Sequence, residues 1–276
     1  MTKPALHLAI IMDGNGRWAE GRGWSRSRGH RAGADAVERV VRAAPDFGIR
    51  TVTLYAFSAD NWSRPRGEVR MLMALFGRFL RTKVEMCRRD GVRLSVIGRR
   101  DRLPATLISS IENAELATRD GDRVHLRLAV DYSARDAIVL AAGWAAGRRL
   151  SRDEFRDLLA RAHHAEPSTP DVDLLIRTGR EKRMSDFLLW ECAYAELYFT
   201  DQLWPDFTSE DLASAVEEFH RRNRRFGGLT NSSPRLEKAI EPDAEYCTQP
   251  FLQNPASTTQ DSETHAVNAD VTWRKS

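Results

Sequence analysis

Residues 13–17, Asp-Gly-Asn-Gly-Arg, follow directly on the apolar run 8–12. The run predicts a buried strand that delivers Asp13 to its carboxyl end, followed by a glycine loop that opens a helix. Gly14 and Gly16 let backbone N–H groups approach a ligand closely, and a helix N-terminus favours anions. A carboxylate beside a phosphate repels it unless a cation lies between them. The segment therefore suggests a site for a diphosphate and Mg²⁺.

The same loop also matches G-x-G-x-x-A, the dinucleotide-binding pattern. That pattern expects an acidic residue about 20 positions later, at the end of the next strand. The next strand is followed by Asp60, which is more than twice too far, while Asp35 and Glu38 have the right offset but fall in a helical pattern. The dinucleotide interpretation is therefore weak, and a plain strand–turn–helix connection stays open for this segment alone.

A second polar segment, 57–65, follows the apolar run 51–57 and ends in Pro65 before another helical pattern. Such a loop lies at the carboxyl end of a strand. Its polar donors and large aromatic ring suit a ligand with a charged head and an apolar body. The alternative is structural, with Asn61 closing a turn and Trp62 buried in the core.

A third segment, 177–185, contains four cations and a hydroxyl beyond the apolar run 172–176. These groups can clamp a diphosphate, although a solvated charged loop is the ordinary interpretation of such a run. Glu196 lies within an aromatic and apolar run, and a carboxylate there needs a cation or a hydrogen-bond partner. It could contact a metal or substrate, or form an ion pair with an arginine.

Apolar runs of strand length alternate with amphipathic helical patterns along the body of the chain. We expect strands at 6–12, 51–57, 92–97, 124–130, 172–176 and 194–199, and helices at 33–44, 67–88, 104–118, 135–146, 151–162 and 208–224. This alternation predicts an α/β domain with a mostly parallel sheet covered by helices on both faces. Ligands of such sheets bind at the carboxyl ends of the strands, where the three polar segments fall.

Composition divides the chain of 276 residues into two parts. Residues 1–228 hold 38 Lys and Arg against 32 Asp and Glu, whereas residues 229–276 hold 4 against 7. The second part is polar and has no sustained apolar period, so we expect a disordered tail after a single catalytic domain. The arginine excess of the body suits phosphate contacts, but arginine use in place of lysine explains it equally well. No nucleic-acid module pattern occurs, and we expect no nucleic-acid partner.

Cysteine use and hydropathy indicate the compartment. Cys87, Cys192 and Cys247 lie far apart without a C-x-x-C pair, which fits a reducing cytoplasm. The N-terminus has too short an apolar stretch for a secretory signal. The longest apolar run, 138–146, is far below the ~18 residues that span a bilayer. We expect a cytoplasmic protein that can still touch a membrane surface.

Taken together, six ordered blocks over roughly residues 6–228 resemble the cis-prenyltransferases, the undecaprenyl diphosphate synthase family. They are HLAIIMDGNGRWA, GHRAG, AFSADNWSRP, DLLIRTGREKRMSDFLLWECAYAEL, FTDQLWPDF and RRFGG. The resemblance implies a homodimer, a hydrophobic tunnel between sheet and helices, and Mg²⁺-dependent condensation of isopentenyl diphosphate with an allylic diphosphate to form a Z double bond. It also implies peripheral contact with a membrane through the product.

The resemblance assigns roles residue by residue. Asp13 serves the metal and the ionisation of the allylic diphosphate, Glu196 assists the metal, and Asn61 is expected to act with Asp13 in catalysis. Arg225 and Gly227 match a terminus that completes the partner subunit's site. The substrate-binding positions are Gly14, Asn15, Gly16, Arg17, Trp18, Arg26 and His30 for the allylic diphosphate, Arg177, Arg183 and Ser185 for isopentenyl diphosphate, and Ser58, Trp62 and Arg64 in the loop that organises both.

The apolar product chain needs a lining, for which the candidates are Leu72, Leu75, Phe76, Phe79, Leu94, Val96, Leu126, Leu128 and Val130; ordinary core is the alternative. Three features depart from the family pattern: Arg180 replaces the second glycine of RTGGE, 131–135 replace N-Y-G-G-R, and the tail is long. The departures leave open the product length, the allylic primer and the role of the tail. A relative with short or specialised products and a catalytically silent accessory subunit are the alternatives within the family.

Overall fold

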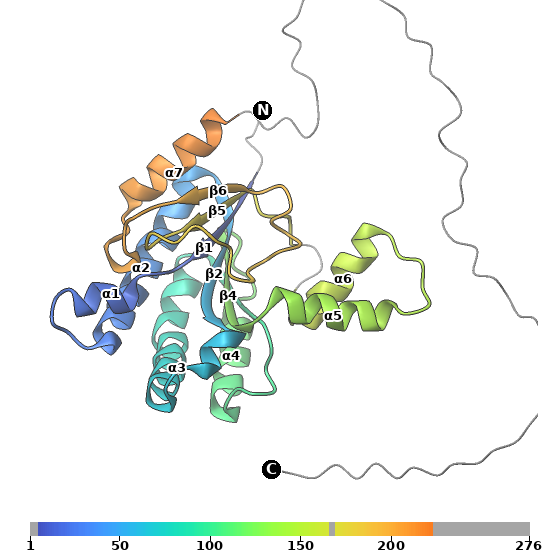
Figure 1. Cartoon of the computed structure of the whole chain (residues 1–276), viewed down its shortest axis with the longest axis horizontal. Helices are drawn as coiled ribbons and strands as arrows, with labels where there is room; N and C mark the ends of the chain where they lie inside the picture. The colour runs from blue at the N-terminus through green and yellow to red at the C-terminus, as the bar shows by residue number, and fades with distance from the viewer. Residues whose placement is uncertain (1–4, 166–168, 223–276) are drawn as a thin grey trace, which may run out of the picture. The chain divides into compact units, whose positions relative to one another are not determined.

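The centre of the fold is a six-stranded parallel sheet, seen here in a computed structural model that describes residues 5–165 and 169–222 (Figure 1). The strand order is β3-β4-β2-β1-β5-β6. The strands are β1 (Leu6–Ile11), β2 (Ile49–Ser58), β3 (Val92–Ile97), β4 (Val124–Tyr132), β5 (Leu174–Arg177) and β6 (Glu196–Phe199). The expected α/β architecture with a parallel sheet is thus confirmed.

Seven α-helices are present in the described residues: α1 (Asn15–Glu20), α2 (Arg26–Ala43), α3 (Arg66–Arg89), α4 (Ala105–Thr118), α5 (Ala134–Ala145), α6 (Arg152–Ala162) and α7 (Ser209–Arg221). Short 3-10 turns η1 (Ala44–Phe47), η2 (Ala59–Ser63) and η3 (Trp204–Asp206) join some of the elements. Most of the expected elements agree with these bounds within two residues. Residues 223–276, including Arg225, Gly227 and the tail, lie outside the described part.

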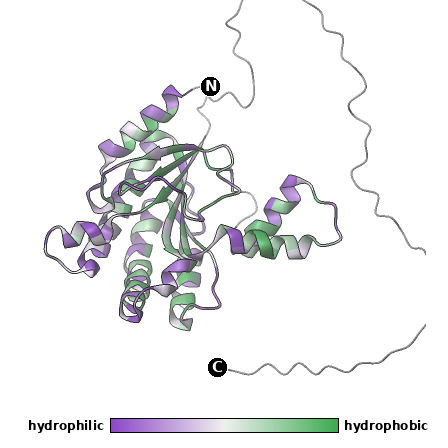
Figure 2. Cartoon of the chain, in the orientation of Figure 1, coloured by the Kyte–Doolittle hydropathy of each residue, from purple (hydrophilic) through white to green (hydrophobic). Residues whose placement is uncertain are grey.

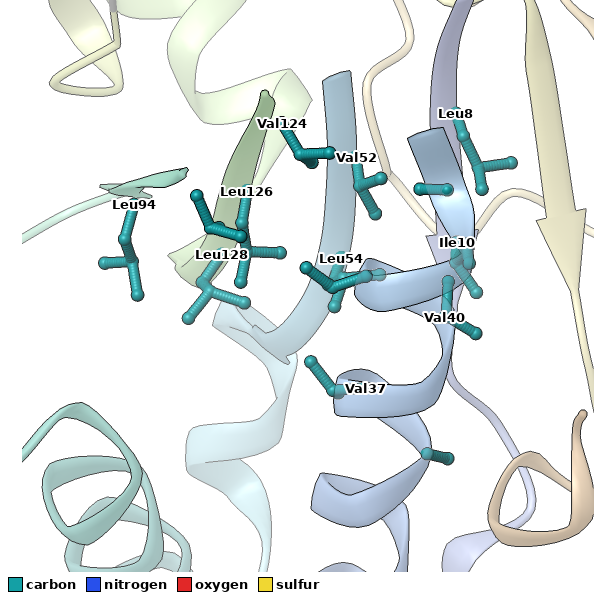
Figure 3. Close-up of a cluster of buried hydrophobic side chains, with 14 of the residues drawn as sticks. Leu8, Ile10, Val37, Val40, Val52, Leu54, Leu94, Val124, Leu126 and Leu128 are labelled. Carbon is teal, nitrogen blue, oxygen red and sulfur yellow. The ribbon is translucent and has the colours of Figure 1, made fainter. Parts of the chain in front are cut away.

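The two faces of the sheet are covered differently. Side chains such as Leu8, Ile10 and Leu54 point to one face and pack against Val37 and Val40 of α2 (Figure 3). Residues of α3, α4 and α7 belong to the same core cluster. On the other face the cover comes mainly from the segment between β5 and β6, through residues including Phe187, Leu188 and Cys192. The expectation of helices on both faces is therefore only partly correct.

The α2 helix begins seven residues before the predicted start at position 33. Its first turns contain glycine, which disfavours helices, so the polar sequence does not reveal them. The structure gives the reason for the glycines: a Cβ on Gly29 would lie 2.0 Å from the Asn15 backbone oxygen. Close contact of α1 with α2 therefore requires glycine inside the helix and places the first turns of α2 beside Asn15.

The α5–α6 hairpin packs on its own small cluster, which includes Ala141 and Leu159, and it extends away from the sheet (Figure 1). Apolar residues gather along α5, whereas most other helices carry a hydrophilic outer side (Figure 2). Val139 and Leu140 of α5 are 73% and 45% exposed. Among the described residues, no helix combines the length and the apolar character needed to cross a membrane.

Candidate active site

The carboxyl ends of three neighbouring strands converge on one cavity. Ile11 of β1 is in register with Tyr55 of β2 and Arg177 of β5, so the residues after these strands lie at one edge of the sheet. A cavity of about 520 Å³ occurs at this edge. Its lining includes the predicted residues Asp13, Gly14, Asn15, Gly16, Arg17, Arg26, His30, Ser58, Asn61, Arg64, Arg177, Arg183 and Ser185. The fold thus brings predicted residues from positions 13 to 185 together around one cavity.

The cavity is polar at these strand ends and apolar along α3 and β4. Six of the nine candidate tunnel residues line it: Leu72, Leu75, Phe76, Phe79, Leu128 and Val130. The other three, Leu94, Val96 and Leu126, are buried in the core under the helices, as Figure 3 shows for Leu94 and Leu126. One cavity therefore offers both a charged end and a hydrocarbon surface.

Asp13 is held between two guanidinium groups. Arg17 Nη2 donates to Asp13 Oδ1 and Arg177 Nη2 donates to Asp13 Oδ2, each at 3.0 Å. The Thr178 hydroxyl fixes the same backbone, accepting from Asp13 N at 3.0 Å and donating to Asp13 O at 2.8 Å. The Asp13 side chain is 29% exposed, so its carboxylate stays accessible from the cavity.

Arg177 is the more buried of the two arginines of the predicted clamp. Its side chain is only 5% exposed, and its Nη1 donates to the Ser185 hydroxyl at 2.7 Å and to the Arg183 backbone oxygen at 2.6 Å. These bonds fold the 177–185 segment back over the strand end. The solvated-loop interpretation therefore fails for Arg177 and Ser185, while the Arg183 guanidinium is exposed and pairs with Glu181.

Glycines allow close packing around the 13–17 loop of the cavity. Gly14 has φ +104°, a backbone conformation that favours glycine over other residues. A Cβ at this position would lie 2.8 Å from a methyl carbon of Leu203. A Cβ on Gly33 would lie 2.2 Å from Asn15 Oδ1. Asn15 Nδ2 donates to Met12 O at 3.1 Å, whereas its Oδ1 is buried without a hydrogen-bond partner. The loop is therefore fixed from both sides before any ligand binds.

Glu68, in the first turn of α3, organises three of the predicted side chains. Its carboxylate accepts from Arg64 Nη1 at 3.1 Å and from Arg26 Nη2 at 3.5 Å, and His30 Nε2 lies 3.9 Å away. Glu68 is not among the site residues predicted from the sequence. Its signal was the i,i+4 spacing from Arg64 at the beginning of a predicted helix.

His30 lies on the cavity as a neutral imidazole. Burial, helped by the nearby Arg64, lowers the pKa of His30 to about 4. Its Nε2 is buried without a hydrogen-bond partner in the described structure. A neutral ring with an unpaired nitrogen can donate a hydrogen bond to a phosphate oxygen in the appropriate tautomer, which agrees with the predicted binding role.

Three predicted site residues do not line this cavity in the described part of the chain. Trp18 Nε1 donates to Asp206 Oδ1 at 2.6 Å, and Trp62 Nε1 donates to Asp131 Oδ1 at 2.9 Å, so both indoles point to structural partners. Glu196 begins β6 in register with Leu174, away from the carboxyl ends, and it pairs with Arg222 at 2.9 Å. Within this chain the arginine alternative holds for Glu196, and its metal role stays a prediction.

Two departures from the family pattern have visible consequences. Arg180 adopts φ +74°, a region that favours glycine, and its N–H donates to Thr200 O at 3.1 Å. Asp131 is completely buried with φ +52° and accepts from Arg102 Nε at 2.9 Å as well as from Trp62. Asp131 thus brings a charge into the fold together with the guanidinium that compensates it.

The donor set fits one mode of Mg²⁺ binding. Asp13 supplies accessible carboxylate oxygens at the polar end of the cavity, surrounded by cations suited to phosphate. No cluster of three or more His, Cys, Asp or Glu side chains able to hold a metal occurs in residues 5–165 and 169–222. Mg²⁺ often binds through one or two carboxylates and substrate phosphates rather than an all-protein cage. Asp13 fits such a site.

Residues 11–227 match the family model described as "Putative undecaprenyl diphosphate synthase". The chain belongs to the cis-prenyltransferase family. Among curated relatives, isoprenyl transferase 1 of Bradyrhizobium diazoefficiens is 56% identical over 230 residues, covering 83% of this chain and 92% of the relative. The isoprenyl transferase of Aquifex pyrophilus is 47% identical, covering 80% and 95%.

Solved structures agree with the fold of this prenyltransferase. Lavandulyl diphosphate synthase from Lavandula x intermedia, in complex with dimethylallyl diphosphate, has a TM-score of 0.74 and 34% identity and covers 80% of this chain and 97% of its own. A "probable undecaprenyl diphosphate synthase" from Campylobacter jejuni has a TM-score of 0.68 and 32% identity, covering 82% and 100%. The chain is therefore an enzyme that transfers prenyl groups.

Proposed function

We propose that the protein is a Mg²⁺-dependent cis-prenyltransferase that condenses isopentenyl diphosphate with an allylic diphosphate to form Z-prenyl diphosphates. The observation that carries the proposal is the single cavity of about 520 Å³ that joins a cationic end to an apolar wall. Both substrates combine a diphosphate with a hydrocarbon. A cavity with this distribution of charge and apolar surface binds both ends of such molecules.

Two groups of cations serve the two diphosphates in this proposal. Arg17, Arg26 and the neutral His30, beside the backbone of the 13–17 loop, bind the allylic diphosphate. Arg177, Arg183 and Ser185 bind isopentenyl diphosphate. The Asp13–Arg177 contact at 3.0 Å supports this arrangement, because it joins the two groups at the edge of one sheet. Holding two substrates in one geometry removes much of the entropic barrier to their reaction.

The reaction requires a bond to break before a new one forms. The carbon–oxygen bond of the allylic diphosphate breaks, and its electron pair leaves with the diphosphate. The terminal alkene carbon of isopentenyl diphosphate then bonds to the allylic carbon, and loss of a proton restores a double bond. No dedicated base lies among the predicted residues, and the departing diphosphate is the acceptor that we propose. Arginines at the polar end stabilise the charge that develops on it.

Mg²⁺, held by Asp13 and diphosphate oxygens, would add positive charge to the leaving group. Asn61 closes the β2–η2 corner, where its Oδ1 accepts from Ser58 N at 3.3 Å, and it lies on the cavity with Arg64. We propose that this corner orients the two substrates. Trp62 supports the corner from behind rather than touching substrate.

The test is an incubation of purified protein with labelled isopentenyl diphosphate, Mg²⁺ and, separately, dimethylallyl, geranyl, farnesyl and geranylgeranyl diphosphates. Mass spectrometry gives product length, and NMR gives the configuration of the new double bond. We expect Z products that disappear when Mg²⁺ is chelated. Full turnover in chelator would contradict the metal role, and no product with any primer would favour a silent accessory subunit.

Product length distinguishes the two active candidates. A lipid-carrier synthase makes long chains, whereas a specialised relative makes short ones. The structural similarity to a lavandulyl diphosphate synthase and the changes at Arg180 and Asp131 favour testing the short primers with equal care. Retention of Asp13, Arg17 and Arg177 in a connected site argues against the silent subunit.

We further propose a homodimer in the cytoplasm, with peripheral membrane contact through long products. The exposed Val139 and Leu140 on α5 support an association surface, because large apolar side chains at such exposure favour contact with a partner. Among the described residues Cys87 and Cys192 are buried free cysteines, which is compatible with the reducing compartment that we propose. Light scattering of the wild type and of the double variant Val139→Glu, Leu140→Glu tests the dimer. If the double variant has the same mass as a dimeric wild type, this surface is not the dimer interface.

A further inference from the structure

A second cavity, of about 420 Å³, lies between α3 and α4. Along α3 its lining residues lie at positions 69, 70, 73, 74, 77 and 81, whereas those of the active-site cavity lie at 72, 73, 75, 76 and 79. At 3.6 residues per turn these two sets occupy adjacent faces of the helix, which meet at Met73. The second cavity is therefore separate from the active site, although Met73 contributes to both.

The inner wall of this cavity is apolar. Val69, Met73 and Leu107 line it and are 7%, 8% and 5% exposed. Pro104 and Trp62 also contribute to the lining. A volume of this size falls within the range of small-molecule sites, roughly 300–1,000 Å³. The wall can therefore bury a short hydrocarbon segment.

The rest of the lining is cationic. Arg70, Arg81 and Arg102 contribute to it, and no carboxylate of the described residues does. Arg102 is bonded to Asp131, but neither Arg70 nor Arg81 forms an ion pair within residues 5–165 and 169–222. Many other arginines of this protein have a carboxylate partner, such as Arg88 with Glu85. The cavity thus gathers positive charge that the fold leaves uncompensated.

A glycine in α3 shapes the cationic end. A Cβ on Gly77 would lie 3.2 Å from Arg81 Nη1 and 3.5 Å from Leu107 Cδ1. The Arg81 guanidinium therefore folds back over the helix at Gly77, toward α4 and the apolar wall. The Arg81 side chain is exposed, and its Nη1 lies at the rim of the cavity beside the apolar wall, as expected for a side chain whose stem packs on apolar surface while its charge stays in water.

We propose that this cavity is a second binding site for a phosphate group carried on a hydrocarbon chain. Guanidinium groups bind phosphate through paired, charge-assisted hydrogen bonds, and the apolar wall takes the first carbons of the chain. The ligand is either a free alkyl or prenyl phosphate or the head and upper chain of an anionic membrane lipid. The site stands on its own lining and does not depend on the proposed catalytic roles.

The test uses isothermal titration with octyl phosphate while farnesyl thiodiphosphate saturates the catalytic cavity. We expect one octyl phosphate to bind per chain, and we expect the affinities for octanol and for inorganic phosphate each to be at least tenfold lower. The double variant Arg70→Gln, Arg81→Gln should bind octyl phosphate with an affinity at least tenfold lower, and its rate of prenyl transfer should be unchanged. Arg78→Gln, on the same helix but outside both linings, is the matched control and should bind like the wild type.

Vesicles of phosphatidylcholine with and without phosphatidylglycerol distinguish a membrane lipid from a free amphiphile as the ligand. Flotation with anionic vesicles that is lost in the double variant would identify a membrane lipid. Octyl phosphate binding without flotation would identify a free amphiphile, and either result supports the site. Unchanged octyl phosphate affinity in the double variant, equal affinity for octanol, or loss of all binding on saturation of the catalytic cavity would overturn the proposal.

Discussion

Arg177 Nη2 donates to Asp13 Oδ2 at 3.0 Å, across a pair of neighbouring parallel strands and 164 positions of sequence. This bond joins the carboxylate of the first polar segment to the buried guanidinium of the third. Arg17 completes the arrangement from the other side of the same carboxylate. The relationship predicts that Asp13 matters for chemistry more than for folding, because its side chain remains partly exposed.

Asp13→Ala should abolish turnover and leave the fold intact. The change removes the carboxylate that we assign to the metal within the cavity, and loss of such a group lowers kcat/KM by about 10²-fold or more. Steady-state kinetics and circular dichroism check the two parts of this prediction. Asp35→Asn, an exposed carboxylate on α2, is the control. Near-normal product formation by Asp13→Ala in Mg²⁺ would remove Asp13 from the mechanism.

Arg102→Met should lower the free energy of unfolding by about 3 kcal/mol, because it leaves the buried Asp131 carboxylate without its cation. Asp131→Asn in the same chain should recover much of that loss, since an amide oxygen still accepts from Trp62. Urea denaturation of the two single variants and the double variant gives the coupling energy. Additive effects would show that the two side chains do not stabilise one another.

Arg180→Gly should stabilise the fold by about 1 kcal/mol, because φ +74° strains a residue with a Cβ more than a glycine. Lys182→Gly, in the same loop but without a positive φ, is the control and should be neutral or destabilising. Urea midpoints measure both. A less stable Arg180→Gly variant would mean that the arginine side chain makes a stabilising contact that outweighs the backbone strain.

The protein should lose stability as the pH falls below about 6.5, because its buried imidazoles resist protonation. Burial lowers the pKa of His163 to about 3 in the folded state, whereas an unfolded histidine has its ordinary pKa of 6.5. The unfolded state therefore binds the proton first, and stability is complete above pH 6.5 and declines as the pH falls toward 3. Each such histidine costs about 2 kcal/mol between pH 6.5 and 5.

His163→Phe isolates one of these contributions. The ring stacks on Tyr132 at 4.2 Å between centroids, and phenylalanine keeps that contact without a titratable group. We expect the unfolding free energy, measured at pH 5, 6 and 7, to fall less steeply with decreasing pH for the variant than for the wild type. The difference between the two slopes should correspond to about one bound proton. Parallel pH profiles for the two proteins would contradict the assigned pKa.

Much of the site followed from local sequence. Apolar runs of strand length placed Asp13, Asn61 and Arg177 after strands, and parallel strands bring such ends together. Elements that cover one face of the sheet were also predictable, because helix periodicity shows directly in the order of apolar residues. The start of α2 was not, since the close approach of Asn15 that selects Gly29 and Gly33 is made by a different helix.

The sequence by itself determined the residue types, their positions after strands and the family pattern. Only the tertiary structure decided the direction in which each side chain points. Glu196 and Trp62 stand in sequence blocks that suggest ligand contact, yet one pairs with Arg222 and the other with Asp131. Glu68, in contrast, joins Arg26, His30 and Arg64. Partners of a charged group are set by long-range folding, because a buried charge needs a counter-charge from whichever element lies beside it.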